Sequence, residues 1–526
     1  MSNDMKRNDF DDDERAYRQA AEARRQRRLK KRRHERNMRI LFITILVVII
    51  AAAAAAAVFL TRGHSGSGGG STQDAPVQET APAEDSVQII TETPAQTEPA
   101  TEAPEPVTEV QTESQSDVLA QAETMALGYD YEGAIALLQS VPGYESDSSI
   151  TQAIAQYQAD LDSCVPVDPL TVPHIFYHSL INDPDSAFNV SVLGQSAVDG
   201  MNAWMTTVEE FDKITQQMYD NGYVFVRLRD LVVETTDENG NVHFEPNNNL
   251  LLPPDKKPVV LSVDDLSYYH SYEAASYPDK LVLDENGKVK CHYVKPDGTE
   301  EIGDFDVVPR LNTFLEEHPD GAYKGARGMI ALTGYNGVFG YRTDTDYRDK
   351  LNLMSDQAQW LEEHPEFSWE EDVEQAKIIA QALKDEGWEF ASHTWGHLSV
   401  TNKTADELRI DNEKWVNTVE NIVGPVDTII FAHGNDIGDW TGYSADNEKY
   451  QYFKSAGYHF YCNVDSSTPY WVQITGDYVR QGRIDLDGYQ LYQASQGLTT
   501  VLDGMFTASE VFDTRRPTPV VANGEA

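Results

Sequence analysis

Cysteine is scarce in this chain of 526 residues, which contains only Cys164, Cys291 and Cys462. An odd number leaves at least one cysteine without a partner inside a monomer, and the isolated positions match no zinc knuckle or redox motif. Cysteine chemistry is therefore excluded as the main clue to function. The length allows two or three domains, each with a core of its own.

Basic residues are also few once the first 40 positions are passed. Residues 1–40 hold 14 Lys and Arg against 8 Asp and Glu, which leaves 27 basic and 78 acidic residues for the other 486 positions. Contacts to nucleic-acid phosphates require a basic surface. We therefore predict no nucleic-acid partner, and the acidic exterior favours a neutral or cationic glycan over an anionic ligand.

A long apolar run occurs at residues 38–60, which read MRILFITILVVIIAAAAAAAVFL. Past Arg39 it provides about 21 uncharged residues, close to the ~20 that span a bilayer as a helix. The basic residues just before it predict that the leader 1–37 stays cytoplasmic and that the chain after residue 61 is outside. A cleaved signal peptide is the alternative, because the alanine run offers an A-x-A-like site. The long leader and the length of the run favour a single-pass membrane anchor.

Three further regions lie outside the main domain and follow this anchor in the sequence. Residues 61–115 have no aromatic residue and are rich in Pro, Thr and Glu, which predicts a disordered linker acting as an extended tether. Residues 116–165 show helical periodicity, and AETMALGYDYEGAIALLQS resembles a tetratricopeptide (TPR) helix pair. We expect a stalk or cap on the next domain rather than a peptide-binding module. Residues 511–526 are predicted to be a flexible tail.

The region 170–510 alternates strand-like and helix-like patterns. Apolar segments at 172–178, 259–263, 328–332, 389–392, 428–432 and 458–464 alternate with helical patterns such as those around 307–317, 370–384, 406–423 and 448–455. This alternation predicts βα units and a mainly parallel sheet, so the domain is of the α/β class. Segments 233–255 and 283–303 contain Asn-Gly and Asp-Gly turns, which indicate hairpin insertions.

Two of the apolar segments end in residues that bind metals. Asp264 and Asp265 follow one strand, and His393 and His397 follow another. Each pattern alone is usually solvated or packed, but two imidazoles and one carboxylate together form the ligand set of many hydrolytic zinc sites. The second carboxylate is then available as a base. Because neighbouring side chains of a strand point to opposite faces, Asp264 and Asp265 should not both bind the metal in the same way.

In order and spacing these segments resemble the polysaccharide deacetylase family (NodB-homology domain, carbohydrate esterase family 4), whose motifs are T-F-D-D-G and H-[ST]-x-x-H. VPHIFYH at 172–178 is similar to the opening of its extracytoplasmic members. The resemblance implies a distorted (β/α) barrel of fewer than eight regular units, with the site at the C-terminal ends of the strands. It also implies that Asp265, His393 and His397 hold a divalent metal, most often Zn²⁺ and sometimes Co²⁺ or Mn²⁺.

The implied reaction removes an acetyl group from an N-acetylated or O-acetylated cell-wall or extracellular polysaccharide. Peptidoglycan or another polymer of N-acetylglucosamine is the expected partner. Metal-bound water, deprotonated by Asp264, would attack the acetyl carbonyl. Thr394 fits the second motif and is expected to orient the ligands through a hydrogen bond.

The sequence departs from the family at several positions. Leu266 replaces a glycine, and Ala432 stands where an arginine commonly pairs with the base. The final L-x-L-H motif, whose histidine protonates the leaving amine, has no convincing equivalent. His178 and His433 are the candidates for this donor, although each alone is more often a packed or surface histidine. Candidates for contacts to the glycan are Tyr335, Tyr341, Asp465 and Trp471.

Three functions compete at this point. The first is a membrane-anchored deacetylase of a Gram-positive-type envelope, with its catalytic domain outside the cell. The second is a catalytically weakened protein that binds metal and glycan, for which Ala432 and the missing final histidine argue. The third is a scaffold for wall synthesis in which the barrel is a passenger. Three metal-binding side chains beside a base argue against this last function.

Overall fold

The structure is a computed structural model that describes residues 115–273 and 275–521. The cytoplasmic leader 1–37, the membrane helix 38–60 and nearly all of the linker 61–115 lie outside these residues and stay predictions. Within the described part of the chain, no helix is both long enough and apolar enough to cross a membrane.

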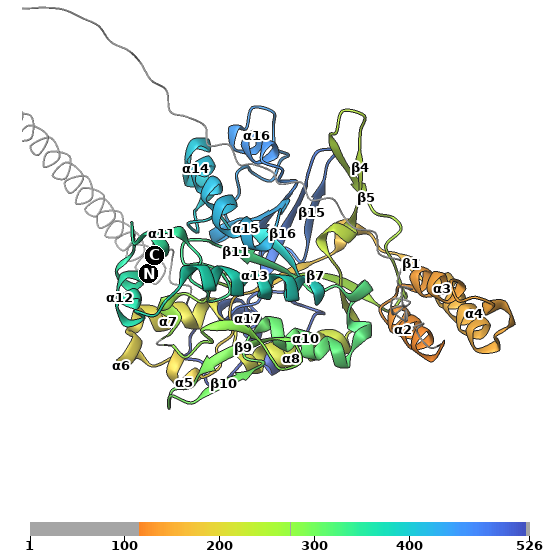
Figure 1. Cartoon of the computed structure of the whole chain (residues 1–526), viewed down its shortest axis with the longest axis horizontal. Coiled ribbons are helices and arrows are strands. Elements are labelled where there is room, and N and C mark those ends of the chain that lie inside the picture. Colours follow the sequence, from red (N-terminus) through yellow and green to blue (C-terminus); the bar gives the residue numbers. More distant parts are fainter. Residues whose placement is uncertain (1–114, 274, 522–526) are drawn as a thin grey trace, which may run out of the picture. The chain divides into compact units, whose positions relative to one another are not determined.

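A closed ring of parallel strands forms the centre of the described part of the chain, and Figure 1 shows its strands β7, β11 and β16 among the covering helices. Each strand pairs in parallel with the next one around the ring, and the last pairs with the first. In the described residues the ring has seven strands: β2 (His174–Tyr177), β7 (Lys257–Asp264), β11 (Met329–Leu332), β12 (Glu389–Ser392), β13 (Thr428–Ile430), β14 (Phe460–Val464) and β16 (Val479–Asp485). The expected α/β barrel with fewer than eight units is therefore observed.

The barrel strands are buried on both faces, as parallel strands covered by helices usually are. Strand β7 shows this clearly, because it is buried from Val259 to its end at Asp264. Polar side chains nevertheless meet in the barrel. His174 lies 3.0 Å from both Ser262 Oγ and Gln481 Oε1, and Arg483 donates to the same Ser262 oxygen at 3.0 Å. Burial, aided by Arg483, lowers the pKa of His174 to about 3, so this imidazole is neutral.

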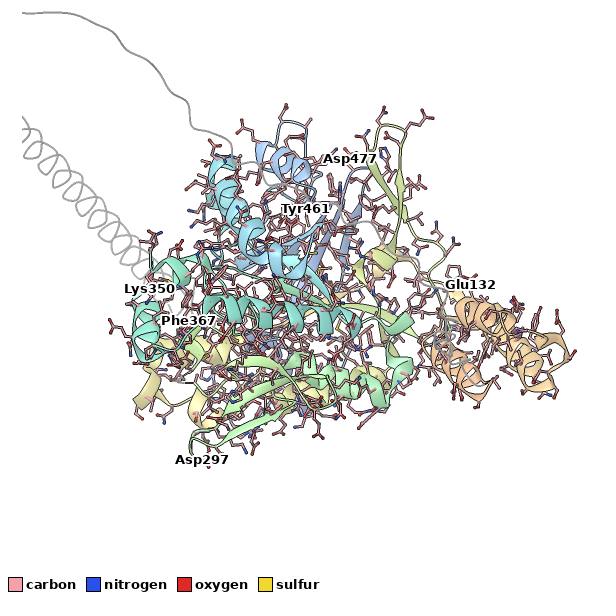
Figure 2. All side chains as sticks on the ribbon, viewed as in Figure 1. Glu132, Asp297, Lys350, Phe367, Tyr461 and Asp477 are labelled. Atoms are coloured by element: carbon pink, nitrogen blue, oxygen red, sulfur yellow. The ribbon has the colours of Figure 1, made fainter. Side chains whose placement is uncertain are left out.

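Shorter strands lie outside the ring. β3 (Tyr223–Phe225) pairs in parallel with the first residues of β7, and β15 (Trp471–Ile474) pairs antiparallel with β16. The insertions predicted at 233–255 and 283–303 are confirmed as separate antiparallel ribbons. Figure 2 shows Asp297 at the tip of one of them. These strands are β4 (Val232–Thr236) with β5 (Val242–Pro246), β8 (Lys280–Leu283) with β9 (Val289–Val294) and β10 (Glu300–Gly303), and β1 (Val165–Pro166) with β6 (Leu251–Leu252).

Helices follow most barrel strands and cover the ring. α8 (Val208–Asp220) is typical: Thr207 and Glu210 form a capping box at its start, and it buries Phe211, Ile214 and Met218 in the main core. The other helices of this region are α5 (Pro184–Ala187), α6 (Val190–Leu193), α7 (Gln195–Trp204), α9 (His270–Glu273), α10 (Val307–Glu317), α11 (Thr345–Asp349), α12 (Ser355–Glu363), α13 (Trp369–Asp385), α14 (Ala405–Trp415), α15 (Asn421–Val423), α16 (Glu448–Ser455), α17 (Gly488–Ser495) and α18 (Ala508–Val511).

Several single turns of tighter or wider helix complete the chain. They are η1 (Tyr144–Ser146), η2 (Pro169–Thr171), η3 (Leu228–Leu231), η4 (Pro319–Gly321), η5 (Tyr323–Gly325), η6 (Val400–Asn402), η7 (Val416–Glu420) and η8 (Ala432–Gly434).

The predicted helical segment forms a unit with a small core of its own (Figure 1). Its helices are α2 (Gln115–Leu127), α3 (Tyr131–Gln139) and α4 (Ser148–Ser163). Polar contacts join it to the barrel: Tyr129 donates a hydrogen bond to the Asp320 carbonyl at 2.7 Å, Lys324 pairs with Asp130 at 3.0 Å, and the Lys324 N–H donates to the Gly128 carbonyl at 2.7 Å. It therefore packs against the segment that contains η4 and η5.

The C-terminal segment differs from the expected flexible tail over residues 511–521. Arg516 is buried and pairs with buried Glu210 of α8 at 2.5 Å. The same guanidinium donates to the Asn202 carbonyl at 3.0 Å and to the carbonyl of Met205 at 2.6 Å. A segment of mixed polar composition gave no periodic signal in the sequence, so this long-range ion pair was not foreseen.

We predict that Arg516→Ala destabilises the domain by about 3–5 kcal/mol, because Glu210 would keep a buried, unpaired charge. Arg409→Ala, which removes an exposed pair with Glu413, is the matched control and should cost less than about 1 kcal/mol. Urea unfolding followed by tryptophan fluorescence measures both values. Equal stabilities for the two variants would show that the C-terminal segment does not contribute to the fold.

Candidate metal centre

The register of three neighbouring strands brings the metal-binding residues to one height at the C-terminal end of the barrel. Asp264, the last residue of β7, lies opposite Ala331 of β11, and Leu332 of β11 lies opposite Ser392 of β12. Asp265 directly follows Asp264, and His393 directly follows Ser392. Their backbone N–H groups donate to the carbonyls of Ala331 at 3.1 Å and Leu332 at 3.0 Å, respectively.

The chain turns sharply directly after Asp264. Asp265 has a φ of 60°, in the left-handed region that costs energy for a residue other than glycine. Asp264 and Asp265 therefore approach one site from different directions, as a division between base and ligand requires. Leu266, which replaces the family's glycine, is fully buried and packs in the main core.

The loop 393–397 is a strained turn rather than a helix. Thr394 and His397 have φ values of 61° and 49°. Buried Asp411 of α14 holds the loop by accepting hydrogen bonds from the backbone N–H groups of Trp395 at 2.7 Å and Gly396 at 2.9 Å. The Thr394 hydroxyl accepts one from the Leu398 N–H at 2.8 Å, so it orients His397 by closing the loop.

Asp265, His393 and His397 each place one ligand atom within 4.8 Å of the others. His397 Nε2 and Asp265 Oδ2 are 3.5 Å apart, and ligand atoms around a tetrahedral zinc ion are separated by about 3.4 Å. His393 Nδ1 donates to the Ile430 carbonyl at 2.8 Å, which leaves the Nε2 lone pair to face the site. The donors and their spacing therefore fit a divalent ion such as Zn²⁺.

A tyrosine that the sequence gave no reason to select supports the carboxylate ligand. Tyr269 donates its hydroxyl hydrogen to Asp265 Oδ1 at 2.6 Å and lies 2.5 Å from Thr333 Oγ1. The ring of Tyr335 stacks on Tyr269 with centroids 5.2 Å apart. Tyr335, expected as part of a glycan-binding wall, therefore lies beside the ligand set. The signal for Tyr269 was its position, four residues after Asp265 in the motif loop.

Asp264 is paired with an arginine that comes from an unexpected strand. Arg483 of β16 donates to both carboxylate oxygens, at 2.8 and 2.9 Å, and both residues are buried. Burial alone would raise the pKa of Asp264, but the guanidinium and His393 outweigh it and hold the pKa below its ordinary value. Ala432 provides no arginine at the position that is usual in the family. Arg483 provides the ion pair with Asp264 instead and keeps this carboxylate ionised.

The two candidate proton donors, His178 and His433, have different surroundings. His178 follows the last residue of β2, is half-buried, and helps to lower the pKa of both Asp264 and Asp265, so its imidazole is near both carboxylates. His433 is exposed in η8, with its ring 4.3 Å from that of His397 and its Nε2 3.3 Å from the His397 carbonyl oxygen.

The remaining predicted contacts to the glycan are spread out. Tyr341 is buried in the main core and donates its hydroxyl hydrogen to the Leu281 carbonyl at 2.9 Å, so the structure gives it a packing role instead. The Asp465 carboxylate accepts hydrogen bonds from Ser467 and Thr468 and thereby folds the loop after β14. Trp471 lies on β15, on the side of β16 opposite to Arg483.

The pKa values of the two imidazole ligands, His393 and His397, are shifted in opposite directions. Burial lowers the pKa of His393 to about 4, which keeps this ligand neutral. For His397 burial is outweighed by Asp265, and the pKa is raised above 6.5. A metal ion that binds His397 must then displace the proton that Asp265 favours on this imidazole. Metal affinity should therefore fall as the pH drops through the raised pKa of His397.

No known family matches the sequence, and no curated protein matches it. Among solved structures, the chain is similar to the Streptococcus pyogenes deacetylase PplD in complex with acetate. The two share 14% identity over 62% of this chain and 98% of that chain, with a TM-score of 0.29. A likeness this distant assigns no function, so the chemistry rests on the side chains of the site.

We predict that Asp265→Asn and His393→Ala each weaken Zn²⁺ binding by at least about 100-fold, more than the loss of an outer-shell contact. His433→Ala is the matched control, because it removes an imidazole that contacts His397 but does not belong to the three-residue cluster. Isothermal titration of the full chain at neutral pH measures the three affinities. Unchanged binding in the first two variants would place the metal elsewhere.

Proposed function

We propose that the protein is a metal-dependent hydrolase that removes acetyl groups from an N-acetylated or O-acetylated polysaccharide. The observation that carries this proposal is an ionised, arginine-paired carboxylate beside a cluster of two imidazoles and one carboxylate. Asp264 Oδ2 lies only 3.9 Å from His393 Nε2. This arrangement suits activation of water next to a bound cation rather than a purely structural metal site, which would have four protein ligands.

Each side chain has a distinct task in this proposal. Asp265, His393 and His397 would hold the ion, which would polarise the acetyl carbonyl as a Lewis acid and lower the pKa of water. Asp264 accepts the proton of the attacking water. Both of its oxygens keep a free lone pair after binding Arg483, because each oxygen accepts two hydrogen bonds. Arg483 then stabilises the base in its charged resting form.

His178 is the preferred donor of the proton that the leaving nitrogen requires. It is half-buried beside both aspartates, whereas His433 is exposed and directs Nε2 toward the backbone of His397. An amine leaves only as a protonated group, while an alkoxide leaves more readily. The absence of a final histidine motif is therefore compatible with turnover if His178, directly after β2, donates the proton.

The substrate and the location follow from chemistry and composition. An acidic exterior suits a neutral or amino polymer, and we propose peptidoglycan or another N-acetylglucosamine polymer. Zn²⁺ is the expected ion, with Co²⁺ or Mn²⁺ as alternatives. We further propose that residues 38–60 anchor the chain in the cell membrane of a Gram-positive-type envelope, with the barrel outside the cell.

A catalytically weakened protein that binds metal and glycan is the second candidate. Two features argued for it: Ala432, and the missing final histidine. The Arg483–Asp264 pair at 2.8 Å removes the first argument, since the base has its arginine. The second depends on whether His178 donates a proton, which the amide-to-ester comparison below decides.

We predict that the full chain with added Zn²⁺ releases acetate from N-acetylglucosamine oligomers or peptidoglycan, and that Asp264→Asn abolishes the release. Zinc affinity should stay within about tenfold of wild type, because Asp264 is not a ligand. Acetate assay and titration calorimetry give the two readouts. Equal acetate release by both proteins would exclude Asp264 as the base, and absence of release beside tight zinc binding would favour the weakened protein.

We predict that His178→Ala slows hydrolysis of an N-acetyl amide by about 10²–10⁴-fold, as expected for loss of a general acid. An activated acetyl ester should be affected far less, because its leaving group needs no proton. His433→Ala serves as the control. The assignment of His178 fails if the amide-selective loss occurs in the His433 variant, or if both substrates slow equally.

A further inference from the structure

A pair of tryptophans lies at the surface beside β16. Trp440, in the loop between β13 and α16, is 53% exposed, and its ring meets that of Trp471 edge-on, with centroids 5.0 Å apart. Trp471 is itself only partly covered. Leaving an indole this exposed forgoes about 1–2 kcal/mol of hydrophobic stabilisation, and paired exposed aromatics are typical of binding surfaces. We call Trp440 and Trp471 the tryptophan pair.

A buried arginine holds the backbone on both sides of Trp440. Arg480 of β16 donates to the carbonyls of Asp439 and Thr441, the two neighbours of Trp440, both at 2.7 Å. It also pairs with Asp436 at 2.8 Å. Because both flanking residues are held, Trp440 is presented to solvent by a rigid support rather than by a free loop.

The surface around the tryptophan pair combines aromatic faces with polar groups. Buried Arg480 supports this surface from the protein side: its guanidinium lies 4.9 Å from the centre of the Trp471 ring and donates to Gln473 Oε1 at 3.0 Å. Gln473, which is partly exposed and two residues after Trp471 on β15, is therefore the polar group beside the indoles. An apolar face bordered by hydrogen-bonding groups matches a sugar ring, which has an apolar C–H face and hydroxyls at its rim. The nearby turn, where Figure 2 marks Asp477, is exposed.

Two backbone segments connect the tryptophan pair to the metal centre. The loop that ends in Trp440 begins near His433, whose ring contacts that of His397. Seven residues span at most about 25 Å, so Trp440 lies within that distance of His433. On the other side, Trp471 pairs with Gly482, the neighbour of Arg483, which holds Asp264. An oligomer of several sugars is long enough to occupy both places.

We propose that Trp440 and Trp471 form a distal subsite that stacks a sugar ring of the polymer several units away from the acetyl group being removed. The substrate class rests on the function proposed above. The ligand is a neutral or amino polysaccharide, because a formal net charge of −45 disfavours an anionic one. A site of this kind makes the protein selective for long chains over single sugars.

Binding of the N-acetylglucosamine hexamer to the full chain tests this proposal without any turnover. The measurements use the Asp264→Asn background with EDTA, and titration calorimetry gives the affinity. We expect Trp440→Ala to bind the hexamer about tenfold more weakly, Trp440→Phe to retain most of the affinity, and Ile410→Ala to bind as the parent does. Ile410 is a matched control because it is an exposed apolar residue on α14.

The outcomes separate this proposal from the proposed function. A parent that does not bind the hexamer, or a Trp440→Ala variant that binds it as tightly as the parent, overturns the distal subsite even if wild type releases acetate. Conversely, a tenfold loss in Trp440→Ala supports the subsite even if the wild-type protein releases no acetate at all. Thermal unfolding of each variant verifies that exposed Trp440 was removed without loss of the fold.

Discussion

The parallel register between β7, β11 and β12 is the constraint on which the site depends. Strand register fixes which residues reach the end of the barrel together, and a slip of one residue would turn every side chain to the other face. Here it sets Asp264 level with Ala331, and Ser392 level with Leu332. The ligands Asp265 and His393 then leave their strands side by side, although they are 128 positions apart in the sequence.

Electrostatic interactions set the charge states of the side chains that the strand register brings together. A carboxylate as buried as Asp264 would ordinarily take up a proton, because burial disfavours its charged form. The two-pronged contact from Arg483 reverses this preference at the cost of burying a second charge. The same barrel interior keeps His174 and His393 neutral, and Arg483 carries the positive charge that pairs with Asp264. The strained φ angles at Asp265, Thr394 and His397 lie at the same point, where backbone strain usually marks a functional site.

Much of this arrangement was predictable from the sequence, and the parts that were not share a physical reason. The apolar runs before Asp264 and His393 are local signals, so the strands could be predicted from residues near one another in the chain. The grouping of Asp265 with His393 and His397 was predicted from the order and spacing of the family's motifs. Arg483 could not, because an arginine inside the polar-looking strand VRQGRID gives no sign that its partner lies 219 positions away. The pairing of Arg516 with Glu210 escaped prediction for the same reason.

Aromatic residues were the least predictable, because tyrosine and tryptophan occur equally in cores and at binding surfaces. Tyr335 and Tyr341 are six positions apart and looked alike in sequence, yet one stacks on Tyr269 beside the ligands and the other is in the core. Trp440 had no motif to mark it. Its environment is set by Arg480, which folds the surrounding loop through backbone carbonyls that no sequence pattern encodes.

The central claim is that one divalent cation binds between Asp265, His393 and His397. A crystal of the protein soaked with zinc, measured at the zinc absorption edge, tests it most directly through the anomalous difference map. We expect one strong peak about 2.0–2.2 Å from Asp265 and from both imidazoles, with Asp264 outside bonding distance and still paired to Arg483. Strong zinc peaks only at other positions would contradict it, as would a fourth protein ligand that closes the site.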